Sequence, residues 1–382
     1  MAMQLGYTMM TEQAGPKDLV RHVVGAEEVG FDFAVSSDHY FPWLDEMGHS
    51  PNAWVSLGAV AQATDRIPLM TYVTCPIFRY HPAVVAQQAA TLQILSDGRF
   101  TLGLGAGENL NEHVVGAGWP PADVRHEMIM EALQIIRDLF DGDGYTNFRG
   151  EHFDVESAKL WDLPEKRVPI GFAAGGKQAA TIAGELADVL VATDPMAELV
   201  EAFEAAGGQG KPKVAQMPIS FGTDKAAAVT RAHSLFRWFG LGWKVNAELP
   251  GTAAFDAASQ FVREEDVESG IPCGDDVEAV IQAAKEYADA GFSHLALVQI
   301  GGDQQEPYLE WTRTSLLPAW READIFTERE ISRDGAVVVG GEIGRAVGAG
   351  IRRTAAVVGL RTARLRAEPA ETRRQLTELF VR

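Results

Sequence analysis

The residues best suited to chemistry follow a run of β-branched and aromatic residues, 31–35, which is typical of a buried strand. Asp38 and His39 come directly after that strand, and Trp43 follows four residues later. The imidazole of His39 can exchange a proton near neutral pH, and the indole of Trp43 offers a flat apolar face with one N–H donor. An acid, a base and an aromatic ring at one strand end predict the floor of an active site.

Two glycine-rich turns are the next candidates. The turn 103–107 reads Gly-Leu-Gly-Ala-Gly before Glu108, and its missing Cβ atoms let the backbone approach a flat ring closely. Gly175 and Gly176 precede a predicted helix, where free N–H groups favour a phosphate, and Lys177 adds positive charge. The first turn follows the fourth predicted strand, whereas a dinucleotide fingerprint follows the first strand of a doubly wound unit.

Each of these candidates also has a structural interpretation. His39 alone could be a hydrogen-bonded core histidine, Glu108 could cap the helix after it, and Cys75 could be a small wall residue. A metal site from Asp38, His39 and His113 is disfavoured, because adjacent strand residues point to opposite faces and no metal-type histidine spacing supports it. The grouping at one strand end favours catalysis for His39, and no metal is predicted.

The elements that position these residues alternate between short β-rich runs and longer amphipathic segments as far as residue 318. Eight strands with helices between them predict a (β/α)8 TIM barrel, with a doubly wound open sheet as the alternative. In such a barrel, the reactive groups lie at the carboxyl ends of the strands. The strands are predicted at 4–9, 31–36, 68–74, 100–104, 169–173, 189–192, 214–221 and 294–300.

Two connections are longer than a plain barrel needs. They span 141–168, after the fourth strand and its helix, and the tryptophan-rich 238–270, after the seventh. Long structured insertions commonly form lids or substrate-binding walls. Helices are predicted to begin at Gly15-Pro16 and to span 52–63, 82–95, 123–140, 177–186, 197–206, 225–236, 276–288 and 306–317.

Charge divides the chain into a barrel, 1–326, and a basic extension, 327–382. The extension holds 11 Arg and 7 acidic residues, giving +4, whereas the whole chain carries −20. That excess of acid disfavours nucleic acid and anionic membranes as partners. The two cysteines lack a metal-type spacing, and we expect neither a signal peptide nor a membrane span, so the prediction is a cytoplasmic protein. For the extension we expect a mobile appendage with a helix at 368–382.

Several short motifs, in order and at near-constant spacing over residues 3–320, resemble the F420-dependent glucose-6-phosphate dehydrogenases of the luciferase-like monooxygenase superfamily. The matching pieces are Leu5-Gly6-Tyr7, Glu12-Gln13, Ser37-Asp38-His39, Pro42-Trp43, Phe78-Arg79-Tyr80-His81-Pro82, Leu104-Gly105-Ala106-Gly107-Glu108-Asn109-Leu110-Asn111-Glu112 and Ala173-Ala174-Gly175-Gly176.

This resemblance implies a TIM barrel that holds the deazaflavin coenzyme F420 at its C-terminal mouth, a small-molecule substrate and a homodimer. It implies that His39 takes the proton of a substrate hydroxyl, that Glu108 protonates the coenzyme, and that Trp43 flanks the reacting carbon. A non-proline cis peptide is implied at Tyr72-Val73. The coenzyme-binding residues expected are Asp38, Tyr72, Val73, Cys75, Gly107, Asn111, Ala174, Gly175, Gly176 and Lys177.

The sequence departs from that family where its sugar-phosphate enzymes place basic residues. The corresponding segments here, 193–196 and 268–270, contain no base. Either a sugar phosphate held by relocated bases or an uncharged alcohol therefore fits. We expect Glu12, Thr193, Trp238 and Lys244 to contact the substrate. An FMN-dependent monooxygenase of the same superfamily and a non-catalytic coenzyme carrier are the alternative functions.

Overall fold

Eight parallel strands close into a barrel in the computed structural model of the chain, in the order β1-β10-β9-β8-β7-β4-β3-β2. The predicted TIM barrel is therefore confirmed, and each predicted strand overlaps one barrel strand. The structure describes residues 2–323, 325, 330–331 and 337–338. The barrel strands are β1 (Gln4–Met9), β2 (Phe33–Ser36), β3 (Leu69–Thr71), β4 (Phe100–Leu104), β7 (Ile170–Ala173), β8 (Val189–Val191), β9 (Lys213–Ile219) and β10 (His294–Gln299).

Helices cover the outside of the barrel, and their ends follow local chemistry. Asn52 accepts the N–H of Val55 at the start of α2 and Asp276 accepts two N–H groups at the start of α12, which satisfies donors that a helix leaves free. The outer helices are α1 (Pro16–Val29), α2 (Ala53–Ala63), α3 (Pro82–Leu95), α5 (Ala122–Asp141), α6 (Lys177–Leu186), α7 (Ala197–Phe203), α8 (Lys225–Phe236), α12 (Val277–Asp289), α13 (Gln305–Trp311) and α14 (Leu317–Glu322).

Apolar side chains fill the space on both sides of the strands. A large cluster packs between the strands and the surrounding helices. A smaller one, including Phe33, Met70 and Val214, joins side chains of different strands. This double burial explains why the strands read as nearly continuous apolar runs instead of alternating ones.

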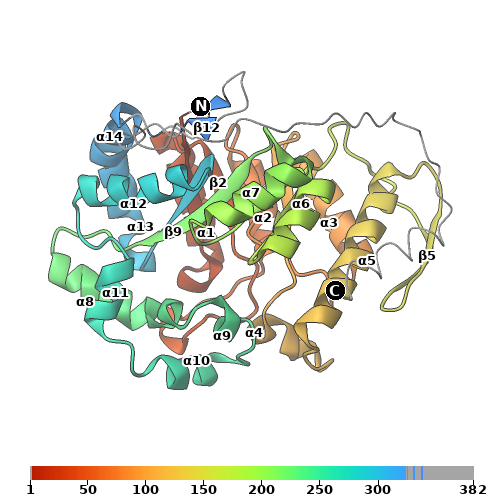
Figure 1. Cartoon of the computed structure of the whole chain (residues 1–382), viewed down its shortest axis with the longest axis horizontal. Helices are drawn as coiled ribbons and strands as arrows, with labels where there is room; N and C mark the ends of the chain where they lie inside the picture. Colours follow the sequence, from red (N-terminus) through yellow and green to blue (C-terminus); the bar gives the residue numbers. More distant parts are fainter. Residues whose placement is uncertain (1, 324, 326–329, 332–336, 339–382) are drawn as a thin grey trace, which may run out of the picture. The chain divides into compact units, whose positions relative to one another are not determined.

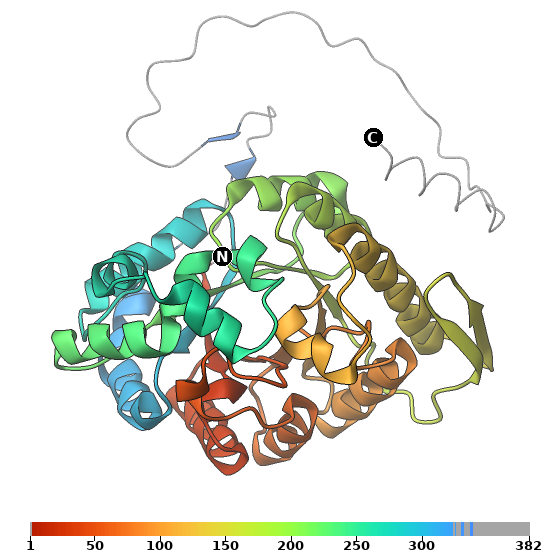
Figure 2. The same cartoon turned by 90° about the horizontal axis from the view of Figure 1, so that it is seen from below.

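The first insertion differs from a lid. It forms an antiparallel hairpin of β5 (Thr146–Arg149) and β6 (Asp154–Ala158), which lies on the outer side of α5 in both views (Figures 1 and 2). The carboxylate of Glu131, on α5, accepts the backbone N–H groups of Glu151, His152 and Phe153 at the turn. The hairpin is therefore held as part of the outer wall.

The second insertion lies at the barrel mouth. It comprises a 3-10 turn, η5 (Arg237–Leu241), and three helices, α9 (Trp243–Asn246), α10 (Thr252–Ser259) and α11 (Glu264–Gly270). Its apolar side chains form a separate cluster with Trp43 and Leu110, which lie after β2 and β4. Figure 2 looks onto this side, where α9 and α10 face the short helix α4 (Asn109–Glu112).

The chain separates into two compact units, Met1–Glu328 and Arg329–Arg382. In the second unit, strands β11 (Glu330–Ile331) and β12 (Val337–Val338) pair antiparallel. The helix expected at 368–382 lies outside the described residues, as does most of the basic extension.

Candidate active site

His39 lies at the mouth, where the chain leaves β2, and its ring is 8% exposed. Its Nδ1 atom is 3.2 Å from the carbonyl oxygen of Phe41 and 3.3 Å from Oε1 of Glu12. Both neighbours are acceptors, so Nδ1 carries the proton and donates it. The neutral ring then has its lone pair on Nε2, the atom that a general base uses.

Glu12 is itself held in place, in the turn after β1. Its second oxygen, Oε2, accepts the hydroxyls of Ser37 at 2.5 Å and Thr11 at 3.0 Å. The carboxyl group is 1% exposed, so its bonds are not shared with bulk water. Glu12 therefore orients the ring of His39 from behind, and the substrate contact expected of it stays a prediction.

Two stacked indoles stand beside this histidine. The ring of Trp43 lies 4.9 Å from that of His39, and 4.0 Å from the ring of Trp238 with an angle of 8° between their planes. Phe255 meets Trp43 edge-on at 5.1 Å. The second insertion thus brings predicted residue Trp238 against predicted residue Trp43, and together they form an aromatic wall next to the base.

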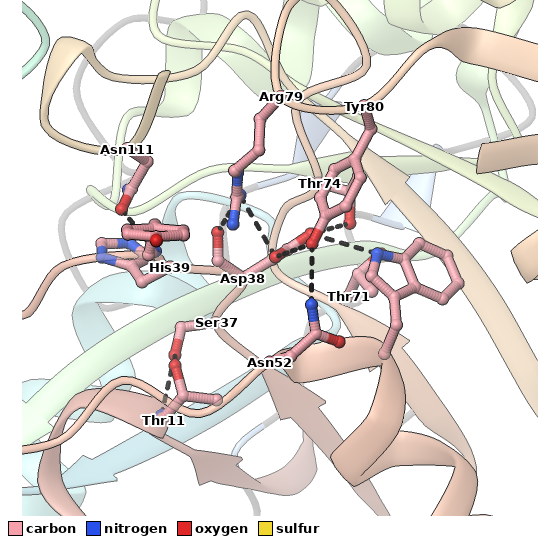
Figure 3. A network of polar contacts seen from close by, with 12 residues as sticks. Thr11, Ser37, Asp38, His39, Asn52, Thr71, Thr74, Arg79, Tyr80 and Asn111 are labelled. Atoms are coloured by element: carbon pink, nitrogen blue, oxygen red, sulfur yellow. Dashed lines mark hydrogen bonds and ion pairs between the residues drawn. The ribbon is translucent and has the colours of Figure 1, made fainter. Parts of the chain in front are cut away.

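Asp38 is buried at the centre of a network of hydrogen bonds (Figure 3). Its Oδ2 atom accepts Thr74 Oγ1 at 2.7 Å and Trp54 Nε1 at 3.2 Å. Its Oδ1 atom lies 3.4 Å from Tyr80 Oη and 3.2 Å from a guanidinium nitrogen of Arg79. These bonds fix the backbone next to His39, and Arg79 adds a bond of 2.6 Å to the Asp38 carbonyl.

Arg79 stands between Asp38 and a second buried carboxyl, Glu112. Glu112 accepts the backbone N–H of Arg79 at 2.8 Å, while its Oε1 lies 3.4 Å from Nε of Arg79 and accepts no hydrogen bond. Burial raises the pKa of Glu112 to about 7, although Arg79 opposes the rise. Burial disfavours the charge of Arg79, but Asp38 and Glu112 outweigh it and raise the pKa of the guanidinium.

Asn111, on α4, links the histidine loop to Glu108, the predicted acid directly before that helix. Its side-chain oxygen accepts the N–H groups of Tyr40 at 2.8 Å and Phe41 at 3.3 Å. Its amide nitrogen donates to Oε2 of Glu108 at 3.3 Å. Glu108 is partly exposed, so the structure presents this acid at the surface of the mouth.

The glycine turn after β4 packs against the end of β3. A Cβ on Gly105 would lie 2.5 Å from Val73, and one on Gly107, which has φ +75°, would lie 2.4 Å from Sγ of Cys75. The Tyr72–Val73 bond is cis, which confirms the expectation from the resemblance. Burial and then Glu112 hold the pKa of the Cys75 thiol well above its ordinary value, so the thiol stays protonated as a wall residue.

The second glycine turn lies at the start of α6. Ala174 is buried, Gly175 is exposed, and no atom lies within 4 Å of a Cβ built on Gly176. The indole of Trp243 on α9 reaches within 3.5 Å of a Cβ position on Gly175. Lys177 pairs with Glu198 at 3.2 Å. Lys244, next to Trp243, is exposed. Thr193 is also exposed, and its carbonyl oxygen accepts a hydrogen bond from Tyr287 Oη at 3.2 Å.

Glu112 and Trp54 had no role in the sequence prediction, and no buried ion pair was expected of Arg79. Arg79 and Glu112 both stand in the matched motifs. Their opposite charges were the sequence signal for the buried ion pair that the structure shows. Trp54 gave no signal, because its helix reads as ordinary core. Among the described residues, no cluster of His, Cys, Asp and Glu is arranged to hold a metal ion, and none of their helices is long and apolar enough to cross a membrane.

The fold and the site define a (β/α)8-barrel protein with a carboxylate-oriented histidine and glycine-lined turns at its C-terminal mouth. A sequence profile described as luciferase-like monooxygenase matches residues 3–294. The chain belongs to this family.

Two kinds of relative are most informative. The chain is 35% identical to an F420-dependent glucose-6-phosphate dehydrogenase of Amycolatopsis mediterranei, over 84% of this chain and 99% of the relative, and 33% identical to a second from Rhodococcus jostii, over 84% and 98%. A solved F420-dependent secondary alcohol dehydrogenase, in complex with an F420-acetone adduct, superposes with a TM-score of 0.76 at 29% identity, over 84% of this chain and all of that one.

Proposed function

We propose that this protein is an F420-dependent dehydrogenase that oxidises a hydroxyl or hemiacetal carbon. The observation that carries the proposal is the histidine whose Nδ1 proton is committed to Glu12 and Phe41, leaving Nε2 as a base at the barrel mouth. Relatives named as F420-dependent dehydrogenases, which this chain matches over most of their length, support the same activity.

His39 performs the proton transfer in this proposal. A carbon bearing a hydroxyl gives up hydride only as the O–H proton leaves, so Nε2 accepts that proton while the C=O bond forms. Glu12 keeps the ring in the required tautomer and stabilises the positive charge that develops on it, as an acid behind a histidine does in other enzymes. Trp43 restricts the position of the reacting carbon beside the ring.

The residues present fit a flat, anionic coenzyme. When bound, F420 supplies a deazaflavin ring that accepts the hydride at C5 and a proton. Gly105 and Gly107 let the turn after β4 pack directly against Val73 and Cys75, since Cβ atoms there would collide with both. Gly175 and Gly176 at the start of α6 suit a phosphate, and Lys177 and Lys244 add positive charge nearby.

Glu108 supplies the proton for the coenzyme side in this proposal. Asn111 holds it at a fixed distance from the histidine loop, because one side chain bonds to Glu108 and to the backbone of Tyr40 and Phe41. The acid is therefore joined through Asn111 to the backbone that follows the base. The localisation in the cytoplasm and the homodimer expected above stay predictions.

The function is tested by mixing purified protein with oxidised F420 and a panel of alcohols and sugar phosphates, and by following the loss of coenzyme absorbance. We expect His39→Ala to lower kcat by about 10²- to 10⁴-fold. His49→Ala, an exposed histidine after the same strand, is the matched control and should keep the wild-type rate. Full activity of His39→Ala would refute the assigned base.

Titration of the apoprotein with F420 and with FMN separates the alternatives. Tight F420 binding with turnover supports the dehydrogenase, and binding without turnover of any substrate supports the coenzyme carrier. Preferential binding of FMN, with oxygen-dependent turnover, would instead assign a monooxygenase.

A further inference from the structure

We infer that the substrate is an uncharged alcohol with an apolar body, and not a sugar phosphate; this rests on the dehydrogenase function proposed above. The inference comes from what surrounds the free side of His39 and Trp43. Three independent features agree: an aromatic wall, basic residues that are already paired, and a carboxylate at the rim.

The aromatic wall is broad and contains little that could bind a polar group. Trp238 stacks on Trp43, and Phe239 meets Trp238 edge-on. Phe255 and Phe236 are buried behind these indoles, at 5.1 Å and 5.0 Å, and support them. The indole N–H of Trp238 is used by the carbonyl of Leu235. Such a wall favours an apolar substrate body, at about 25 cal/mol for each Å² of apolar surface buried.

Arg237 of the insertion and Lys225 of the preceding helix α8 are engaged in ion pairs. Arg237 pairs with Asp256 at 2.7 Å and with Glu46 at 3.2 Å, and it also donates to a backbone carbonyl. Lys225 pairs with Glu268 of α11 at 2.8 Å. A phosphate would have to break the pairs of the largely buried Arg237 to recruit it, whereas the exposed pair of Lys225 contributes only about 0–1 kcal/mol.

Arg231, the remaining arginine near the ends of β9 and β10, is held by neutral acceptors. It donates to the carbonyls of Phe221 and Ile300 and to Oγ of Ser220. Those bonds close the barrel end, so turning its guanidinium toward a ligand would leave buried acceptors unsatisfied, at about 1–3 kcal/mol each.

A carboxylate stands at the rim of the mouth after β8. Burial first, and then Asp194, raise the pKa of Tyr287, whose hydroxyl lies 3.2 Å from the carbonyl of Thr193. Tyr72, from the end of β3, is affected by Asp194 as well. Tyr72 also donates its hydroxyl to the carbonyl of Ala192, two residues before the exposed Asp194, so this carboxylate lies near the ends of β3 and β8, where it would repel a dianion.

The two exposed lysines of this region lie on the other side. Lys244 is on α9, whose neighbouring segment is fixed by the bond from Asn109 N–H to the carbonyl of Ala247 at 3.0 Å, and whose Trp243 packs over Gly175. Lys177 begins α6. Lys177 follows the second glycine turn, and Lys244 is the neighbour of Trp243, which packs over that turn. Among the described basic residues considered for this region, Lys244 alone is exposed without an ion pair, and Arg237 and Arg231 are already engaged in the fold.

Two measurements test the inference on the F420-loaded protein. In turnover, kcat/KM for short secondary alcohols such as 2-propanol and cyclohexanol should exceed that for glucose 6-phosphate by at least about 100-fold. In thermal-shift titrations, neither glucose 6-phosphate nor inorganic phosphate should change Tm at concentrations up to about 5 mM. Preference for glucose 6-phosphate, or its saturable binding, would overturn the inference and leave the dehydrogenase function standing.

A failure of the proposed function gives a different result. If F420 does not bind, the dehydrogenase itself is refuted. If F420 binds and no uncharged alcohol in the panel is oxidised, the substrate inference is wrong whatever the result with glucose 6-phosphate.

A charge-reversal pair tests the role of the rim carboxylate. Asp194→Lys should raise kcat/KM for glucose 6-phosphate relative to that for 2-propanol by about tenfold, since a repulsive charge becomes attractive at the mouth. Asp162→Lys makes the same change in net charge at an exposed site of the first insertion, and it should leave the ratio as it is in the wild type. An equal shift in both variants would assign the effect to overall charge and refute the role of Asp194.

Discussion

The buried carboxyl of Glu112 makes the stability of this protein depend on pH in a way that one substitution removes. The group is fully buried, one of its oxygens accepts no hydrogen bond, and burial raises its pKa from 4.5 to about 7. Glu112→Gln keeps the size of the side chain and an acceptor for the Arg79 N–H, but it cannot ionise. The comparison of the two proteins therefore isolates the titration of one group.

The sign of the effect follows from proton binding. The folded protein holds a proton on Glu112 between pH 4.5 and 7, where the unfolded chain has lost it. The stabilisation is fully present below pH 4.5 and is lost as the pH rises through 7. At about 1.4 kcal/mol for each pH unit, the free energy of unfolding of the wild type should fall relative to Glu112→Gln by about 2 to 3 kcal/mol between pH 5 and pH 8.

Urea unfolding at about pH 5, 6, 7 and 8 measures the difference in free energy of unfolding between the wild type and Glu112→Gln. Glu112 titrates within this range. Glu165→Gln, an exposed site before β7, supplies the baseline for exchanging Glu for Gln. A difference between wild type and Glu112→Gln that is the same at every pH, within about 0.5 kcal/mol, would show that Glu112 does not titrate in this window.

Three further predictions use the same unfolding assay. Gly107→Ala should cost about 2 to 4 kcal/mol, because its Cβ would meet Cys75, whereas Gly116→Ala, at φ +73° with open space around it, should cost about 1 kcal/mol; equal costs would contradict the packing argument. A double-mutant cycle at Trp43 and Trp238, with Leu at each site, should give a coupling of about 0.5 to 1.5 kcal/mol, and no coupling would mean that the stack is not formed in solution. Asn111→Leu leaves the backbone N–H groups of Tyr40 and Phe41 without their acceptor and should lower the free energy of unfolding by about 2 to 4 kcal/mol. Asn111→Asp retains an acceptor oxygen and should cost less. The reverse order would show that the link to Glu108 matters more than the two N–H bonds.

The barrel could be predicted because its information is local. Each strand is a short apolar run and each helix carries its own start signal, so the number and order of elements are readable without knowing what they touch. The same locality placed His39 and Trp43 at a strand end and the glycines after β4 and β7. The hairpin at 141–168 was not predicted, because its exposed strands carry no apolar run.

The contacts within the site are set by the tertiary structure. Glu12 meets His39 because β1 and β2 are neighbours in the closed barrel, with Met9 paired to Ser36. Trp43 stacks on Trp238, a residue far along the chain, because the second insertion folds back over the mouth.

Arg79 and its two carboxyl partners show most clearly what the sequence determined and what the tertiary structure decided. By itself the sequence determined which groups stand at the strand ends, since alternation and turn residues fix where each strand stops. Only the closed barrel decided which of those groups are buried together, and burial is what places Arg79 between Asp38 and Glu112 and raises the pKa of Glu112 to about 7. Spacing along a chain carries no measure of exclusion from water, so the sequence did not show that Asp38, which was expected to contact the coenzyme, is buried against Thr74 and Trp54.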